Sequence, residues 1–259
     1  MRVSLSATVA ATILAAALPR IACATPSTTF WAPSTPFVQP LGVLHVTYDT
    51  YFGSKTAYPI DVGLTMGVLP WKGFQSEIGF DLFYPSIAGS GAIDVPLVLN
   101  AKVGAPEDTY FKGQPGWSVG VFGVGFKKHF NDQNVLHAMI GKTLPHAGAA
   151  SIGGYYALNE NLFRSADGKE GRSGFMAGWL SPSIDVPRID RIVLAWDIQT
   201  GRNVLGATGG GAYLYFTPAV DLLLGPVFFF EDELQPAGSK SLWTVQLDVD
   251  LDLLSGDKK

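Results

Sequence analysis

Strict alternation of apolar and polar side chains marks the stretch Trp243-Thr244-Val245-Gln246-Leu247-Asp248-Val249-Asp250-Leu251-Asp252-Leu253. A period of two is typical of a β-strand whose two faces meet different surroundings. Here one face is wholly apolar, and the other carries Thr, Gln and three Asp side chains. Segments of about ten residues with this pattern are typical of membrane barrels, which turn apolar side chains to lipid and polar ones to the lumen.

Similar segments recur along the chain between residues 41 and 254. Twelve can be marked, at residues 43–52, 58–69, 74–83, 95–103, 116–126, 134–143, 147–158, 173–181, 189–199, 205–217, 220–231 and 241–253. An even number lets both ends of a closed barrel lie on one side. The sequence therefore predicts an all-β fold, a closed antiparallel transmembrane β-barrel of about 12 strands. The range is 10–14, because the glycines at 209–211 could form a bulge or a break.

Aromatic residues near the expected strand ends would form girdles at the two membrane interfaces. They are Tyr51, Phe52, Tyr58, Trp71, Phe74, Phe83, Tyr84, Trp117, Phe126, Tyr215, Phe228, Phe230 and Trp243.

The start of the chain has the pattern of a cleaved export signal. Arg2 supplies a positive charge, residues 3–18 are apolar or small, and Ala22-Cys23-Ala24 fits a cleavage site, so residues 1–24 are predicted to be a signal peptide. A lipoprotein would instead use Cys23, but Arg20 lies where such signals carry an aliphatic residue. Cleavage after Ala24 removes the only cysteine, so the mature chain has no disulfide.

Residues 25–40 contain four prolines, which cannot sustain a regular element. We expect them to form a periplasmic lead-in, with entry into the barrel lumen as the other placement. Residues 41–254 would form the barrel, and residues 255–259 a polar C-terminal tail.

The composition agrees with a membrane barrel and argues against nucleic-acid binding. Mean hydropathy is +0.22 with only 15% charged residues, yet no apolar run beyond the signal is long enough for a spanning helix. Without Arg2 and Arg20, 16 Lys and Arg face 22 Asp and Glu, a net charge of −6. No basic stripe remains that could follow a phosphate backbone. A soluble β-sandwich conflicts with so many outward apolar faces.

Charged residues on the polar faces are the candidates for lining the lumen, and most are acidic. They are Asp49, Asp61, Glu77, Asp81, Lys102, Arg191, Asp197, Asp221, Asp248, Asp250 and Asp252. Three carboxylates at alternate positions of one strand, about 7 Å apart, repel one another and need water, cations or basic partners. The expected lumen is therefore acidic. Asp250 and Asp252 could together bind a divalent cation through their oxygens, but no loop has calcium-binding spacing, so no metal site and no cofactor are predicted.

The sequence does not indicate a catalytic site. H-E-x-x-H and P-loop patterns are missing from the sequence, and its match to G-x-S-x-G, at residues 116–120, lies within an expected strand and not at a strand-to-helix turn. His45, Thr47 and Asp49 share one strand face and only loosely match a nucleophile and its base, so they are interpreted as lumen residues. A lipid-modifying barrel enzyme would require His45 and Thr47 to face lipid.

Three low-specificity stretches support a family resemblance. They are Pro36-Phe37-Val38-Gln39-Pro40, Gly63-Leu64-Thr65-Met66-Gly67-Val68-Leu69-Pro70 and Asn100-Ala101-Lys102-Val103-Gly104. With them the mature chain resembles the small, uncharacterised outer-membrane β-barrels of Gram-negative bacteria, especially the transporter-like barrels associated with aromatic-degradation pathways. The resemblance implies no catalytic residues. The polar end at 255–259 departs from the aromatic final residue of most such barrels.

The sequence is therefore interpreted as a porin-like outer-membrane barrel, a narrow channel or transporter for small solutes, with cations or neutral molecules preferred. Its expected partners are outer-membrane lipid and a small solute or cation. The alternative is a structural barrel that binds another envelope protein, for which the charged loop at residues 159–172 would be the contact surface.

Overall fold

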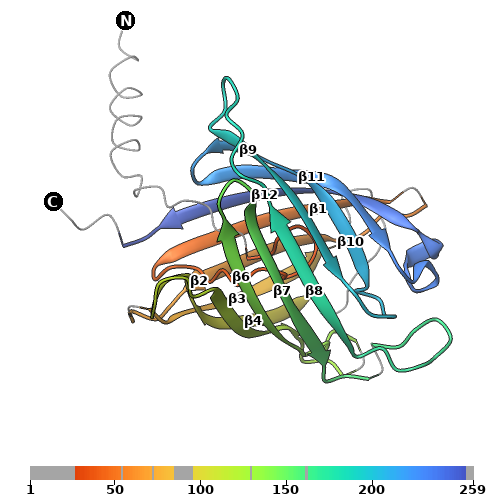
Figure 1. Ribbon diagram of the computed structural model, residues 1–259. Coiled ribbons are helices and arrows are strands. Elements are labelled where there is room, and N and C mark those ends of the chain that lie inside the picture. Colours follow the sequence, from red (N-terminus) through yellow and green to blue (C-terminus); the bar gives the residue numbers. More distant parts are fainter. Residues whose placement is uncertain are drawn as a thin grey trace, which may run out of the picture.

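The computed structural model describes residues 27–53, 55–71, 73–84, 96–128, 130–160 and 163–254. The predicted signal peptide, the first two residues of the lead-in and the tail at 255–259 lie outside the described residues. Twelve antiparallel strands close into one barrel, with each strand next to its neighbours in sequence and the first strand paired with the last (Figure 1). The predicted fold class and strand number are confirmed.

The strand bounds follow the sequence pattern closely. The strands are β1 (Val43–Gly53), β2 (Ile60–Gly67), β3 (Gln75–Tyr84), β4 (Leu97–Ala105), β5 (Gly116–Val124), β6 (Val135–Leu144), β7 (Gly148–Ala157), β8 (Ser173–Leu180), β9 (Arg191–Gln199), β10 (Ala207–Thr217), β11 (Val220–Phe229) and β12 (Ser241–Asp252). Every bound lies within two residues of the expected one, because alternation and turn chemistry both identify where a strand stops.

The seam between β1 and β12 fixes the two ends of the barrel. Val43 pairs with Asp252 at one end, and Gly53 pairs with Leu242 at the other. We call the first the terminal end, because β1 begins there and β12 ends there. The opposite end is the loop end, where two short 3-10 turns, Asp232–Leu234 and Pro236–Gly238, precede β12.

The two faces of β12 point in the predicted directions, apolar outward and polar inward. Trp243 is 55% exposed on the outer surface, whereas Thr244, Gln246, Asp248 and Asp250 are buried inside. Among the described residues, no helix is long and apolar enough to span a membrane.

Four aromatic residues expected in the girdles lie inside the barrel instead. Tyr58 and Tyr215 are buried, Tyr51 donates a hydrogen bond to Asp49, and Phe83 lines an internal cavity. They find ring partners there: Trp31 packs edge-on against Tyr51, and Phe229 stacks on Tyr58. The assignment of these four residues to the girdles was wrong, because a position near a strand end does not determine whether the side chain points into the barrel or toward lipid.

The proline-rich lead-in occupies the lumen. Its described part, residues 27–40, is named here the N-terminal segment. Of the two placements that the sequence left open, this is the internal one, since Phe30, Ala32, Ser34 and Gln39 are at most 1% exposed.

Candidate functional site

A single carboxylate fastens the N-terminal segment to the barrel wall. Asp197 of β9 is fully buried, and its Oδ2 accepts backbone N–H bonds from Phe30, Trp31 and Ala32 at 3.0, 2.9 and 2.8 Å. The Ser34 hydroxyl donates a further bond at 3.2 Å. Successive backbone N–H groups converging on one anion form a nest. Asp197 was predicted to line the lumen, and it holds the segment that fills it.

Glycines on the inner wall make room for the same segment. A Cβ atom on Gly209 would lie 2.7 Å from the Phe30 ring, and one on Gly178 would lie 2.7 Å from the Thr29 hydroxyl. The pairing of β10 with β9 continues through residues 209–211, and the register of β10 with β11 is the same before and after these glycines. These glycines therefore form neither a bulge nor a break. They form a socket for Phe30.

Further hydrogen bonds hold the segment on both sides. Tyr213 donates to the Thr29 carbonyl at 2.8 Å, and the Gln39 N–H donates to Glu77 Oε2 at 2.6 Å. Lys102 donates to the Ser27 carbonyl at 3.3 Å and pairs with Glu77 at 3.2 Å. Sequence reasoning did not identify Phe30 and Trp31 as lumen residues. The sequence signal for them was the glycines at inward positions of β8 and β10, which leave space in the lumen for the aromatic side chains of a proline-rich segment.

A cavity of about 350 Å³ remains beside the segment, along the β1–β5 wall. Six of the eleven predicted lumen residues line it: Asp49, Asp61, Glu77, Asp81, Lys102 and Asp248. Asp49 and Asp61 are register partners on β1 and β2, and Asp81 on β3 lies opposite Gly63. Three adjacent strands thus bring their carboxylates to one wall.

The expected repulsion along β12 is relieved by a histidine. His45 Nδ1 lies 2.6 Å from Asp250 Oδ1, and its Nε2 lies 3.7 Å from Asp248 Oδ1. Asp221 on β11 is the register partner of Asp248 and is also buried. His45 is thus a basic partner for two of the three β12 carboxylates, Asp248 and Asp250.

The two remaining candidates lie near the terminal end. The Arg191 guanidinium is 3.7 Å from the centre of the Tyr215 ring, and it also pairs with Asp190. Asp252 is the last residue of β12 and accepts a hydrogen bond from the Leu254 N–H at 3.0 Å. Neither residue lines the cavity.

The lipid-modifying alternative conflicts with the geometry of β1. His45 and Thr47 both line the internal cavity and do not face lipid. Within the described part of the chain, no three His, Cys, Asp or Glu side chains are placed to hold a metal ion.

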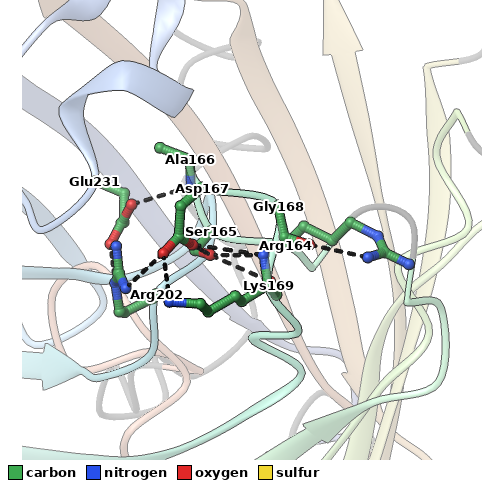
Figure 2. Close-up of polar contacts among 8 residues, drawn as sticks. All are labelled: Arg164, Ser165, Ala166, Asp167, Gly168, Lys169, Arg202 and Glu231. Atoms are coloured by element: carbon green, nitrogen blue, oxygen red, sulfur yellow. Dashed lines mark hydrogen bonds and ion pairs between the residues drawn. The ribbon is translucent and has the colours of Figure 1, made fainter.

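A network of ion pairs ties together the connections at the loop end (Figure 2). Arg202 Nε lies 2.6 Å from Glu231 Oε1, and Arg202 also pairs with Asp167 at 3.4 Å. Lys169 pairs with Asp167 at 3.0 Å, and the Ala166 N–H donates to Glu231 at 3.1 Å. Several charges that made residues 159–172 look available for a partner are therefore engaged within the protein.

The loop-end network is expected to loosen in acid. The hydrogen bond from Ser165, followed by that from Lys169, lowers the pKa of Asp167, and the bond from Arg202 lowers the pKa of Glu231. Carboxylates with lowered pKa stabilise the folded loop above their unfolded values, about 4, and lose this contribution as pH falls further. Hydrogen exchange of residues 163–171, corrected for its intrinsic pH dependence, should be constant from about pH 7 to 5 and faster below about pH 4.

Arg202→Gln should give the faster exchange already at neutral pH. Lys240→Gln, at a longer 3.9 Å pair with Asp232, is the control and should change little. Equal protection of residues 163–171 at pH 7 and pH 3 would contradict the assignment.

Sequence comparison finds no matching family model and no matching curated protein. Several solved structures are similar in fold. The NanC porin matches with a TM-score of 0.52 and 11% identity, over 81% of this chain and all of the porin. An outer membrane channel from Pseudomonas putida F1 gives a TM-score of 0.49 and 15% identity, over 88% of this chain and all of the channel.

The dimeric outer membrane phospholipase of Salmonella typhi gives a TM-score of 0.45 and 13% identity, over 80% of this chain and 90% of the enzyme. Among these three structures, only the similarity to the porin is strong enough to carry an argument, and at 11% identity it concerns the fold alone. The resemblance to outer-membrane barrels is thus confirmed at the level of architecture: the chain has the closed β-barrel fold of an outer-membrane porin.

Proposed function

We propose that this chain is an outer-membrane channel for small solutes and that its path runs along the β1–β5 wall, beside the N-terminal segment. The observation that carries the proposal is the cavity of about 350 Å³ inside a closed barrel. The N-terminal segment contacts β8–β10 and also bonds to Glu77 and Lys102 on the β1–β5 wall, so the remaining path is narrow. Solutes that fit it are small.

The same wall supports a preference for cations. Asp49, Asp61 and Asp81 face the cavity from three adjacent strands, and Lys102, the one lysine among the lining residues, is paired with Glu77. A cation passing about 4 Å from one carboxylate gains about 1 kcal/mol even at the dielectric constant of water. That gain corresponds to about a fivefold preference over a neutral solute.

Ion selectivity in planar bilayers tests this function. The refolded mature chain should give discrete conductance steps whose reversal potential in a KCl gradient favours K⁺. Asp49→Asn, Asp61→Asn and Asp81→Asn together should lower the K⁺ to Cl⁻ permeability ratio about fivefold. Asp185→Asn, which removes an exposed charge between β8 and β9, is the matched control. A folded barrel that never conducts would refute the channel and favour the structural or partner-binding alternative.

A further inference from the structure

The carboxylates of the β1–β3 wall form their hydrogen bonds with neutral groups. Asp81 accepts a hydrogen bond from the Asn100 amide at 2.6 Å, and Asp49 accepts one from the Tyr51 hydroxyl at 3.1 Å, both neutral donors. The other oxygen of Asp49 and one oxygen of Asp61 are buried without a hydrogen-bond partner in the described part of the chain. No ion pair among the described residues includes Asp49, Asp61 or Asp81. No positive charge from a paired side chain therefore balances these three carboxyl groups within the described part of the chain.

The nearby basic groups are already engaged. Lys102 lies 3.2 Å from Glu77, and His45 lies 2.6 Å from Asp250. Cross-strand neighbours such as Asp49 and Asp61 have Cβ atoms about 5 Å apart, where like charges repel. A cation delivered from outside would relieve that repulsion.

A second observation within the cavity points to a bound molecule. His137 of β6 lines the same cavity and is only 5% exposed, yet its Nδ1 has no hydrogen-bond partner among the described residues. Buried polar nitrogens are rarely left unpaired in proteins. A ligand that occupies the cavity could supply the missing partner.

Aromatic rings form part of the remaining lining, and they define the body of that ligand. Phe30 and Trp31 come from the N-terminal segment, and Phe83 and Phe122 from β3 and β5. Gly63 keeps the wall bare beside Asp81, since a Cβ there would lie 2.9 Å from Asp81 Oδ1. The volume of about 350 Å³ lies at the lower end of the range for small-molecule pockets, about 300–1,000 Å³.

We propose that the cavity binds a small amphipathic organic cation. Its ammonium or guanidinium group would lie against Asp49, Asp61 and Asp81, and its apolar body against Phe30, Trp31 and Phe83. Aromatic faces attract organic cations as well as apolar groups. A bare divalent ion fits less well, because the described side chains offer no three-ligand metal site. The inference rests on the proposed function in naming the class of solute that its path would select.

Equilibrium binding to the refolded mature chain in neutral detergent tests the inference independently of conduction. The probes are 2-phenylethylammonium, the neutral 2-phenylethanol and the anion phenylacetate, measured by titration calorimetry. The amine should bind at least about tenfold more tightly than the alcohol, and phenylacetate should not bind. Raising the salt concentration from 0.1 to 1 M should weaken the amine alone.

Variants locate the binding site. Asp61→Asn should weaken amine binding about tenfold and leave the alcohol unchanged, whereas the control Asp185→Asn should change neither. Heat-modifiable migration in gels confirms that each variant is folded. Equal affinity for amine and alcohol, or unchanged amine binding by folded Asp61→Asn, would overturn the inference. A barrel that conducts but does not bind the amine refutes this inference and supports the channel function. A barrel that binds the amine but does not conduct supports the binding site and refutes the channel function.

Discussion

Asp197→Ala is expected to free the N-terminal segment and to raise single-channel conductance severalfold. The change removes the acceptor for three buried N–H groups and the Ser34 hydroxyl. Each buried donor left unpaired costs about 1–3 kcal/mol, so loss of the acceptor for the three N–H groups should lower the free energy of unfolding by about 3–9 kcal/mol if the segment stays in place. Release of the segment avoids part of that cost and opens the lumen.

Planar-bilayer recording and urea unfolding in lipid vesicles measure the two effects. Ser34→Ala removes one of the four bonds and should give a small change in both quantities. Added protease should cut the segment in Asp197→Ala, and should leave the wild-type segment intact. Unchanged conductance and protection in a folded Asp197→Ala barrel would show that Asp197 does not anchor the segment.

Phe30→Ala is expected to be the most destabilising single truncation in the segment. Phe30 is 1% exposed and packs against Gly209 and Gly211, where no side chain can replace its ring. Truncation of a buried Phe costs about 3–5 kcal/mol. The loss should appear in urea unfolding and as noisier, larger conductance steps.

A double-mutant cycle with Gly209→Ala separates packing from a general effect on the barrel. Alone, the added methyl group collides with the Phe30 ring at 2.7 Å and should cost about 1–3 kcal/mol. In the Phe30→Ala background the same change fills empty space and should be neutral or stabilising. Gly210→Ala, on the opposite face of the same strand, is the control and should show no coupling to residue 30. Additive effects at positions 209 and 30 would contradict the socket.

The strands could be predicted from sequence because their signal is local. Each strand alternates over about ten residues, and the turns between them contain Gly, Pro and Asn. The inward position of Asp49, Asp61 and Asp248 follows from the same alternation, and the cavity lining agrees with it. The sequence pattern therefore agrees with the structure for features that neighbouring residues determine, such as strand bounds and the direction of side chains.

The contents of the lumen could not be predicted because they depend on contacts between distant residues. Asp197 and Phe30 are 167 residues apart, and neither position reveals the other. His45 and Asp250 meet only because β1 closes on β12 in one register. Tyr58 and Tyr215 resemble interfacial aromatics in sequence, but both belong to a buried cluster that includes Phe30 of the N-terminal segment.

The distance in sequence between the N-terminal segment and its anchors imposes an order on assembly. Residues 27–40 leave the ribosome before any strand, yet Asp197 and the Gly209 socket belong to β9 and β10. Contacts of such high sequence separation are slow to form, because a long stretch of chain must first be brought together. The part of the lumen that is synthesised first therefore cannot be secured before β9 and β10 exist, and a barrel still missing these strands would hold no anchor for it.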